Sequence, residues 1–89
     1  MLEKNIQAAI IRFLKKTYKD CIVWKLTEET NCGIPDICFI YRGNVVFIEV
    51  KRPGGVISKI QNNTLRRLRQ NQIDAFIAYS VEDVKNYLE

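Results

Sequence analysis

Histidine is absent from this chain of 89 residues. Its absence excludes every mechanism that needs an imidazole as a base, a nucleophile or a metal ligand, including Ser-His-Asp hydrolysis and nucleases with a histidine-bound metal. Cysteine is scarce: Cys21, Cys32 and Cys38 are odd in number, and their spacing matches no paired metal-ligand motif. We therefore expect neither a disulfide framework nor a zinc site, and we expect a reducing, intracellular setting in the cytoplasm.

Long apolar stretches are missing as well. The longest apolar runs have the length of a strand, so the sequence predicts no membrane-spanning helix and no secretory signal. A chain of this length has room for one domain, residues 1–89, with a modest core that a partner subunit would enlarge. The net charge of +4 and the isoelectric point near 9.1 are compatible with a polyanionic partner without establishing one.

Hydrophobic periodicity and turn residues predict the element order α-β-β-β-α-β-α. Helices are expected at residues 2–18, from Ser58 onward and from Ser80 to the C-terminus, and strands at residues 21–26, 36–41, 45–51 and 74–79. Strand, helix and strand follow one another after residue 45, which implies a right-handed crossover between parallel strands. The preceding hairpin is antiparallel, so the predicted class is α/β, with a mixed sheet flanked by helices. Trp24 and Tyr41 are candidates for the core, for the rim or for stacking on bases, and the core is the default assignment.

Charged residues interrupt the apolar pattern of the predicted hairpin. Glu49 and Lys51 are two residues apart in one strand, so both side chains point to the same face. If the turn is formed by residues 42–43, Asp36 lies opposite Glu49, and if it is formed by residues 43–44, Asp36 lies opposite Lys51. Directly paired residues share a face, so either register gathers the three side chains, whereas a three-residue loop would place Asp36 on the other face.

This cluster has the chemistry of a metal site for phosphodiester hydrolysis. Mg²⁺ and Mn²⁺ prefer carboxylate, carbonyl and water oxygens, which Asp36, Glu49 and the backbone carbonyl of Val50 could provide. Water bound to such an ion loses its proton more easily and becomes a nucleophile. Lys51 can orient that water and stabilise the charge that grows on the phosphorane. The sequence therefore predicts phosphodiester hydrolysis without histidine.

Two further polar residues fall on apolar stripes of the predicted helices. Glu3 shares its stripe with Ile10, and Gln61 shares its stripe with Leu65, so both are expected to face the sheet. Each has a structural alternative. Glu3 favours a helix N-terminus through the helix dipole, and Gln61 completes a capping box with Ser58.

Five features together resemble the VRR-NUC family of the PD-(D/E)xK nuclease superfamily. They are GIPD at residues 33–36, EVK at 49–51, RPGG at 52–55, the following Gln61 and the upstream Glu3. The resemblance covers nearly the whole chain and is to the short, stand-alone versions from phages and bacteria. It is the joint presence of the motifs that makes the resemblance specific, because a PD and an ExK alone are a short pattern.

The resemblance implies a metal-dependent nuclease with a restriction-endonuclease-like αβββαβ core, similar in layout to Holliday-junction resolvases. It implies that Glu3, Asp36 and Glu49 are acids of an Mg²⁺ or Mn²⁺ site, that Lys51 is the catalytic lysine and that Gln61 is an additional active-site residue. It further implies structure-selective cutting of branched DNA, such as Holliday junctions or flaps, by a homodimer in the cytoplasm of a phage host or bacterium.

Basic residues of two helices are candidate contacts to DNA phosphates. They are Lys59, Arg66, Arg67 and Arg69, with Lys15, Lys16 and Lys19 at or just after the end of the first helix. The alternative is that they form the solvated faces of amphipathic helices. Thr27 and Thr30 are further candidates near the phosphate. At the level of function, the alternatives are a non-catalytic nucleic-acid-binding or assembly module on a nuclease scaffold, and a nuclease of single-strand ends or RNA.

Overall fold

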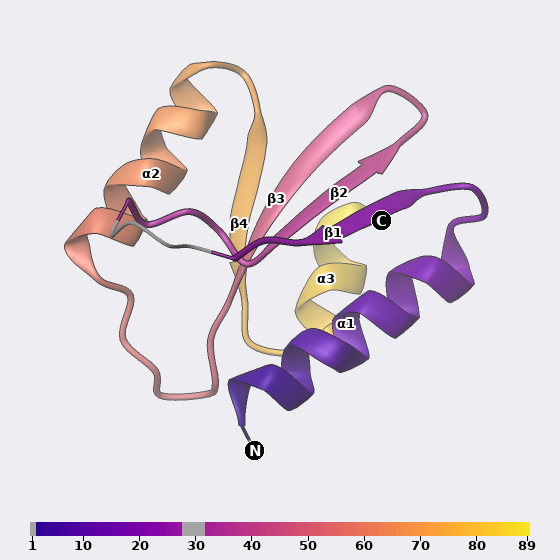
Figure 1. Cartoon of the computed structure of the whole chain (residues 1–89), viewed down its shortest axis with the longest axis horizontal. Helices are drawn as coiled ribbons and strands as arrows, with labels where there is room; N and C mark the ends of the chain where they lie inside the picture. The colour runs from indigo at the N-terminus through magenta and orange to yellow at the C-terminus, as the bar shows by residue number, and fades with distance from the viewer. Residues whose placement is uncertain (1, 28–31) are drawn as a thin grey trace.

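The computed structural model describes residues 2–27 and 32–89. In these residues the elements are α1 (Glu3–Thr17), β1 (Ile22–Lys25), β2 (Ile37–Tyr41), β3 (Asn44–Val50), α2 (Lys59–Gln70), β4 (Asp74–Ala78) and α3 (Val81–Leu88) (Figure 1). The predicted order is confirmed. Among the described residues no helix combines the length and the apolar character needed to cross a bilayer.

The sheet has the order β1-β2-β3-β4 and is mixed, as predicted. β1, β2 and β3 are antiparallel neighbours, and β4 runs parallel to β3 after the crossover through α2. α1 and α3 pack on one face of the sheet, and α2 lies over the opposite face beside β4 (Figure 1). The sheet is therefore the middle layer between unequal helical layers.

The core lies between the sheet and α1 with α3. Ile6, Ile10 and Leu14 recur every four residues on α1, which places them on one helical face. They pack against the inward side chains of β2 and β3, among which Ile37 and Ile48 are fully buried. Burial of aliphatic side chains on this scale is the main stabilising contribution to a small domain.

A two-residue turn sets the register of the central hairpin. Arg42 and Gly43 both have positive φ, 48° and 84°, as a type I′ turn requires. Tyr41 therefore pairs with Asn44, and the ladder continues to Ile37 opposite Ile48. Of the two registers left open by the sequence, the structure has the one with its turn at residues 42–43.

The default core assignment of Trp24 is wrong. Its side chain is 55% exposed, whereas Tyr41 is half-buried and packs on Tyr18. Trp24 points to the face opposite α1, because it pairs with Cys38 rather than with a residue of the α1 side. α2 packs on this face over β4, at the other end of the sheet, and so it does not cover the edge strand β1.

The segment that leads into β2 docks on the first two turns of α2. Gly33 and Pro35 are buried, and the Thr64 hydroxyl donates to the Cys32 carbonyl at 2.8 Å. Gly33 has a φ of 73°, and a Cβ at this position would lie 2.7–2.8 Å from side-chain and backbone atoms of Ile60. A glycine is required at this position by conformation and by space, and its docking places the start of β2 relative to α2.

Gly33→Ala is expected to lower the free energy of unfolding by about 2–4 kcal/mol, because overpacking against Ile60 adds to the cost of a left-handed backbone. Gly54→Ala is the matched control, since Gly54 has a φ of 82° but no neighbouring atom within 4 Å of a Cβ. It is expected to cost only about 1–2 kcal/mol. Urea unfolding of both variants measures the difference, and equal losses would show that the contact with Ile60 is unimportant.

Candidate active site

The hairpin register brings Asp36 and Glu49 together. Asp36 immediately precedes β2, and the ladder that pairs Ile37 with Ile48 places it opposite Glu49. The two carboxyl groups are near enough for the charge of Asp36, and hydrogen bonding with it, to raise the pKa of Glu49. The Asp36 oxygen Oδ2 accepts a hydrogen bond from the Val50 backbone N–H at 2.8 Å, which fixes the orientation of this carboxyl group. The predicted meeting of these two acids is present in the structure.

Among the charged residues that the structure describes, Glu49 is the one that is buried, and 2% of its surface is exposed. Its pKa is raised from 4.5 to about 8. Burial is the largest cause, followed by the charge of Asp36 and the hydrogen bond with it, while the nearby Lys51 ammonium opposes the rise. Two adjacent carboxyl groups cannot both ionise at low cost unless a cation lies beside them.

Lys51 follows the last residue of β3 and lies on the same face as Glu49. Its backbone N–H donates to the Ala78 carbonyl at 3.0 Å, so the chain continues in contact with β4 beyond the end of β3. The side chain is half-buried, and its positive charge acts on Glu49. The third member of the predicted cluster is therefore near enough to the carboxyl pair for its charge to act on Glu49.

Gln61 makes both of the contacts that the sequence presented as alternatives. Its side-chain oxygen Oε1 accepts from the Ser58 backbone N–H at 3.1 Å, and the Ser58 hydroxyl accepts from the Gln61 backbone N–H, also at 3.1 Å. Its side-chain nitrogen Nε2 donates to Oε2 of Glu49 at 3.1 Å. One amide group therefore caps α2 through its oxygen and holds the buried carboxyl group through its nitrogen.

Val50 and Glu3 are placed differently with respect to the pair. The N–H and C=O of one strand residue point to the same neighbouring strand. The Val50 backbone N–H donates to Asp36, so the Val50 carbonyl also points towards Asp36. Glu3, the first residue of α1, is half-buried, and its charge is the smallest cause that raises the pKa of Glu49.

Within the ranges 2–27 and 32–89, no three acidic or cysteine side chains are grouped closely enough to hold a metal ion. The structure therefore brings together two carboxyl groups, Asp36 and Glu49, and Glu3 lies outside this pair. The role of Glu3 as a metal-site acid stays a prediction. Thr27 is exposed, and Thr30 lies outside the described residues.

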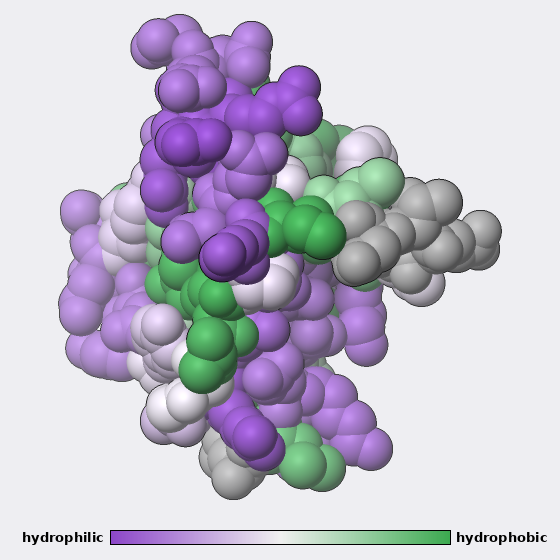
Figure 2. Space-filling model, turned by 90° about the vertical axis from the view of Figure 1, so that its left-hand side faces the viewer, coloured by the Kyte–Doolittle hydropathy of each residue, from purple (hydrophilic) through white to green (hydrophobic). Residues whose placement is uncertain are grey.

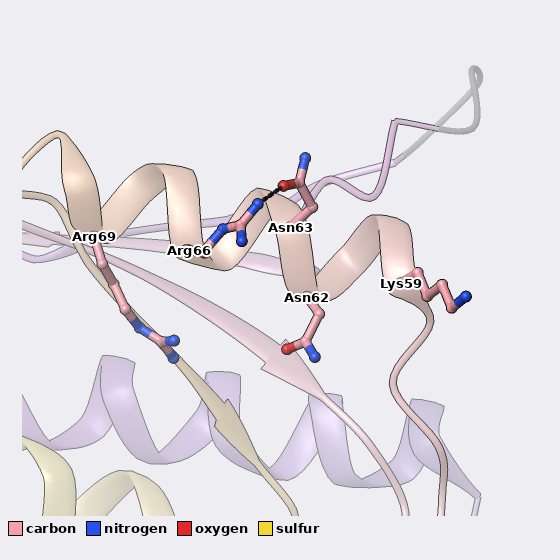
Figure 3. A pocket seen from close by; sticks show the side chains of 5 residues that line it. All are labelled: Lys59, Asn62, Asn63, Arg66 and Arg69. Carbon is pink, nitrogen blue, oxygen red and sulfur yellow. Dashed lines mark hydrogen bonds between the residues drawn. The ribbon is translucent and has the colours of Figure 1, made fainter.

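The basic candidates separate onto different surfaces. Three of the candidates, Lys59, Arg66 and Arg69, line a groove along α2, together with two amides that were not among the candidates, Asn62 and Asn63 (Figure 3). Arg67 lines a separate hollow on the same helix, and Lys16 is exposed on α1. Spacing could have grouped the five groove residues, because they recur at helical intervals of three and four, but uncharged amides carry no signal of their own.

The comparisons with known proteins agree on one family. The model of the VRR-NUC domain family matches residues 2–82. A solved VRR-NUC domain superposes with a TM-score of 0.83 at 25% sequence identity, over 97% of this chain and 92% of that one. A second solved VRR-NUC domain protein gives a TM-score of 0.81 at 16% identity, over 99% and 85%, which is a likeness of fold alone. No curated protein matches the chain.

The raised pKa of Glu49 predicts that the metal-free protein loses stability as the pH rises. The unfolded carboxyl group releases its proton near pH 4.5, whereas the folded one keeps it up to about pH 8. Below pH 4.5 both states are protonated and nothing is lost. Between these values the free energy of unfolding falls, by a few kcal/mol in order of magnitude, and above pH 8 this contribution levels off.

Thermal unfolding in EDTA from pH 4.5 to pH 9 measures this slope. Glu49→Gln is expected to flatten it, because an amide cannot ionise. Glu82→Gln, which removes an exposed carboxyl group from the first turn of α3, is the control and is expected to keep the wild-type slope. The same slope in the wild type and in Glu49→Gln would contradict the assignment.

Proposed function

The chain belongs to the VRR-NUC domain family, and from this premise we propose that it is a metal-dependent endodeoxyribonuclease that hydrolyses phosphodiester bonds. The observation that carries the proposal is the facing pair of Asp36 and Glu49, with Glu49 buried and its pKa raised to about 8. Such a pair lowers the stability of the metal-free fold, and strongly perturbed carboxyl groups are typical of functional sites. A cation that binds between the two groups accounts for their proximity.

The residues present fit a hard dication such as Mg²⁺ or Mn²⁺. Asp36 and Glu49 would hold it through carboxylate oxygens, and the Val50 carbonyl offers a neutral oxygen on the side of Asp36. Glu3 is a further carboxylate in the neighbourhood. When bound, such an ion supplies Lewis acidity and makes water easier to deprotonate.

The residues of the chain orient the reacting groups. The Val50 N–H holds the Asp36 carboxylate, and Gln61 Nε2 holds the Glu49 carboxylate, so neither has to reorganise during the reaction. The Lys51 ammonium lies beside them, where it orients the attacking water and stabilises the negative charge that develops on the phosphate. The water loses a proton to solvent as its oxygen bonds to phosphorus, the bond to the leaving oxygen breaks, and that oxygen takes up a proton from solvent.

The proposed substrate and oligomeric state rest on the family resemblance and on the properties of the surface. We propose branched DNA, such as four-way junctions or flaps, because the sequence motifs resemble those of stand-alone nucleases similar to junction resolvases. The net charge of +4 and the cations of α2 suit a polyanion. A homodimer is supported by the exposed apolar side chains of Ile22 and Trp24 on β1, which are 44% and 55% exposed.

The competing function is a non-catalytic nucleic-acid-binding module. Such a module would have no use for Glu49, because a buried carboxyl group with a raised pKa contributes nothing to the binding of a polyanion. The hydrogen bonds that hold Asp36 and Glu49 in defined orientations therefore favour the enzyme.

With Mn²⁺ the purified protein is expected to cut a four-way junction or a flap in preference to a linear duplex, and EDTA is expected to abolish the cutting. Asp36→Ala, Glu49→Ala and Lys51→Ala are each expected to reduce the rate by at least about 100-fold, because each removes a group that acts on the reacting phosphate. Circular dichroism checks that the variants are folded, and Glu82→Ala serves as the control. Undiminished cutting by folded Glu49→Ala would exclude this mechanism.

Gln61 and Ser58 provide a test that separates capping from catalysis. Both Gln61→Ala and Ser58→Ala break the capping box and are expected to cost about 1 kcal/mol of stability. Only Gln61→Ala removes the hydrogen bond to Glu49, so only this variant is expected to lose roughly tenfold or more in cleavage rate at saturating DNA. Equal rates for the two variants, measured well below their melting temperatures, would assign Gln61 to the cap alone.

A further inference from the structure

α2 carries an unbalanced charge along its exposed side. Four of its twelve residues are basic and none is acidic: KIQNNTLRRLRQ. Figure 2 shows hydrophilic side chains gathered over the upper part of the face on which α2 lies in Figure 1. A surface helix whose charge serves only solubility usually carries both signs, because pairs three and four residues apart are favourable. The excess of one sign points to a ligand of the opposite sign.

The described residues that line the groove of about 530 Å³ along this helix are cations and amides. They are Lys59, Asn62, Asn63, Arg66 and Arg69, and no carboxylate of residues 2–27 or 32–89 is among them (Figure 3). The Asn63 side-chain oxygen accepts a hydrogen bond from Arg66. Arg69 donates from Nε to the Ala75 carbonyl at 2.8 Å. These two bonds hold the guanidinium groups in fixed directions, which lowers the entropy cost of binding an anion.

The position of Lys59 indicates that the positive charge does not serve to stabilise α2. It is the first residue of α2, the position at which the helix dipole favours an acid and disfavours a cation, and no acid is present in the first turn. The basic residues of the last turn, in contrast, suit the dipole. A residue that weakens its own helix is better explained by a contact made outside the helix.

The groove starts in the same turn of α2 as a residue of the candidate active site. Asn62 directly follows Gln61, whose side chain holds Glu49, and Lys59 lies two residues before it. From Lys59 to Arg69 the helix rises about 15 Å, which matches roughly four phosphates of one strand of a duplex. We infer that this groove binds the sugar–phosphate backbone of the DNA strand that flanks the scissile phosphate, an inference that rests on the proposed nuclease function. The described part of its lining contains no aromatic ring to stack on a base, so we expect the contact to be independent of sequence.

Salt-dependent binding tests the groove without requiring cleavage. The probes are two flap DNAs of the same shape and unrelated sequence, bound to the full chain in EDTA between 50 and 200 mM salt. The triple variant Lys59→Gln, Arg66→Gln, Arg69→Gln is expected to lower the slope of log K against log salt by about 2–3, equally on both sequences. Arg12→Gln, which removes an exposed charge from α1 on the other side of the sheet, is expected to lower it by less than 0.5 as an order of magnitude.

Lys59→Glu gives a readout that a structural role would not produce. It is expected to raise the melting temperature, because an acid suits the first turn of a helix, while it weakens DNA binding. Within the helix, Arg66→Gln is expected to weaken binding more than Arg67→Gln does, since Arg67 lines a separate hollow. Equal losses of DNA affinity in Arg66→Gln and Arg67→Gln, or DNA binding unaffected by Lys59→Glu, would overturn the inference that the groove binds DNA.

The inference and the proposed function fail separately. If the wild type cuts DNA with Mn²⁺ but the triple variant binds as Arg12→Gln does, the groove is wrong and the nuclease stands. If the wild type cuts no DNA but its binding depends on the three groove cations, the groove stands and the nuclease falls. If both hold, the triple variant is expected to raise KM with little change in kcat, because the groove lies outside the reacting groups.

Discussion

Burial of the Glu49 carboxyl group is the constraint around which the rest of the structure is arranged. A carboxyl group removed from water is costly unless each of its polar atoms is satisfied. The groups that act on it come from different parts of the chain: Gln61 in α2 donates a hydrogen bond, Asp36 lies opposite at the start of β2, and the charge of Lys51 beyond β3 opposes the rise of its pKa. Two strands, a helix and the loop before β2 must therefore be assembled correctly before Glu49 is satisfied. The candidate site and the tertiary fold are thus parts of one arrangement.

Local backbone conformation sets the geometry of this arrangement. The turn at Arg42 and Gly43 determines which residue faces Glu49, because a turn formed one residue later would place Asp36 opposite Lys51 instead. At the opposite end of β2, Gly33 packs closely on Ile60 of α2. This contact holds the loop before β2, which includes Asp36, against α2. Residues with positive φ therefore position β2 at both of its ends. These two points set the position of Asp36 relative to Glu49.

Much of this was predictable from the sequence, and the exceptions have physical causes. Alternation in 45–51 was enough to place Glu49 and Lys51 on one face, but the choice between two registers depends on a turn that two neighbouring residue pairs can both form. The dual contact of Gln61 depends on how α2 crosses the sheet, which local sequence does not specify. Trp24 was assigned to the core on its residue type, and its exposure follows from the position of α2 over β4 instead. The local sequence pattern predicted the helices and strands. Their packing decided the residue opposite Glu49, the second contact of Gln61 and the exposure of Trp24.

α2 links the site to the surface beside it. The Gln61 side chain reaches Glu49 from the first turn of this helix, and Gly33 docks on the neighbouring Ile60. The cations and amides of the groove project from the same helix. A helix with its hydrogen bonds intact is stiff over twelve residues, so a displacement of its N-terminus that disturbs Glu49 must also displace Lys59 and Arg66. Because the side chain that closes the capping box also holds the buried carboxyl group, the start of α2 cannot fray without releasing Glu49. The distance between the carboxyl pair and the groove is therefore set by a single rigid element.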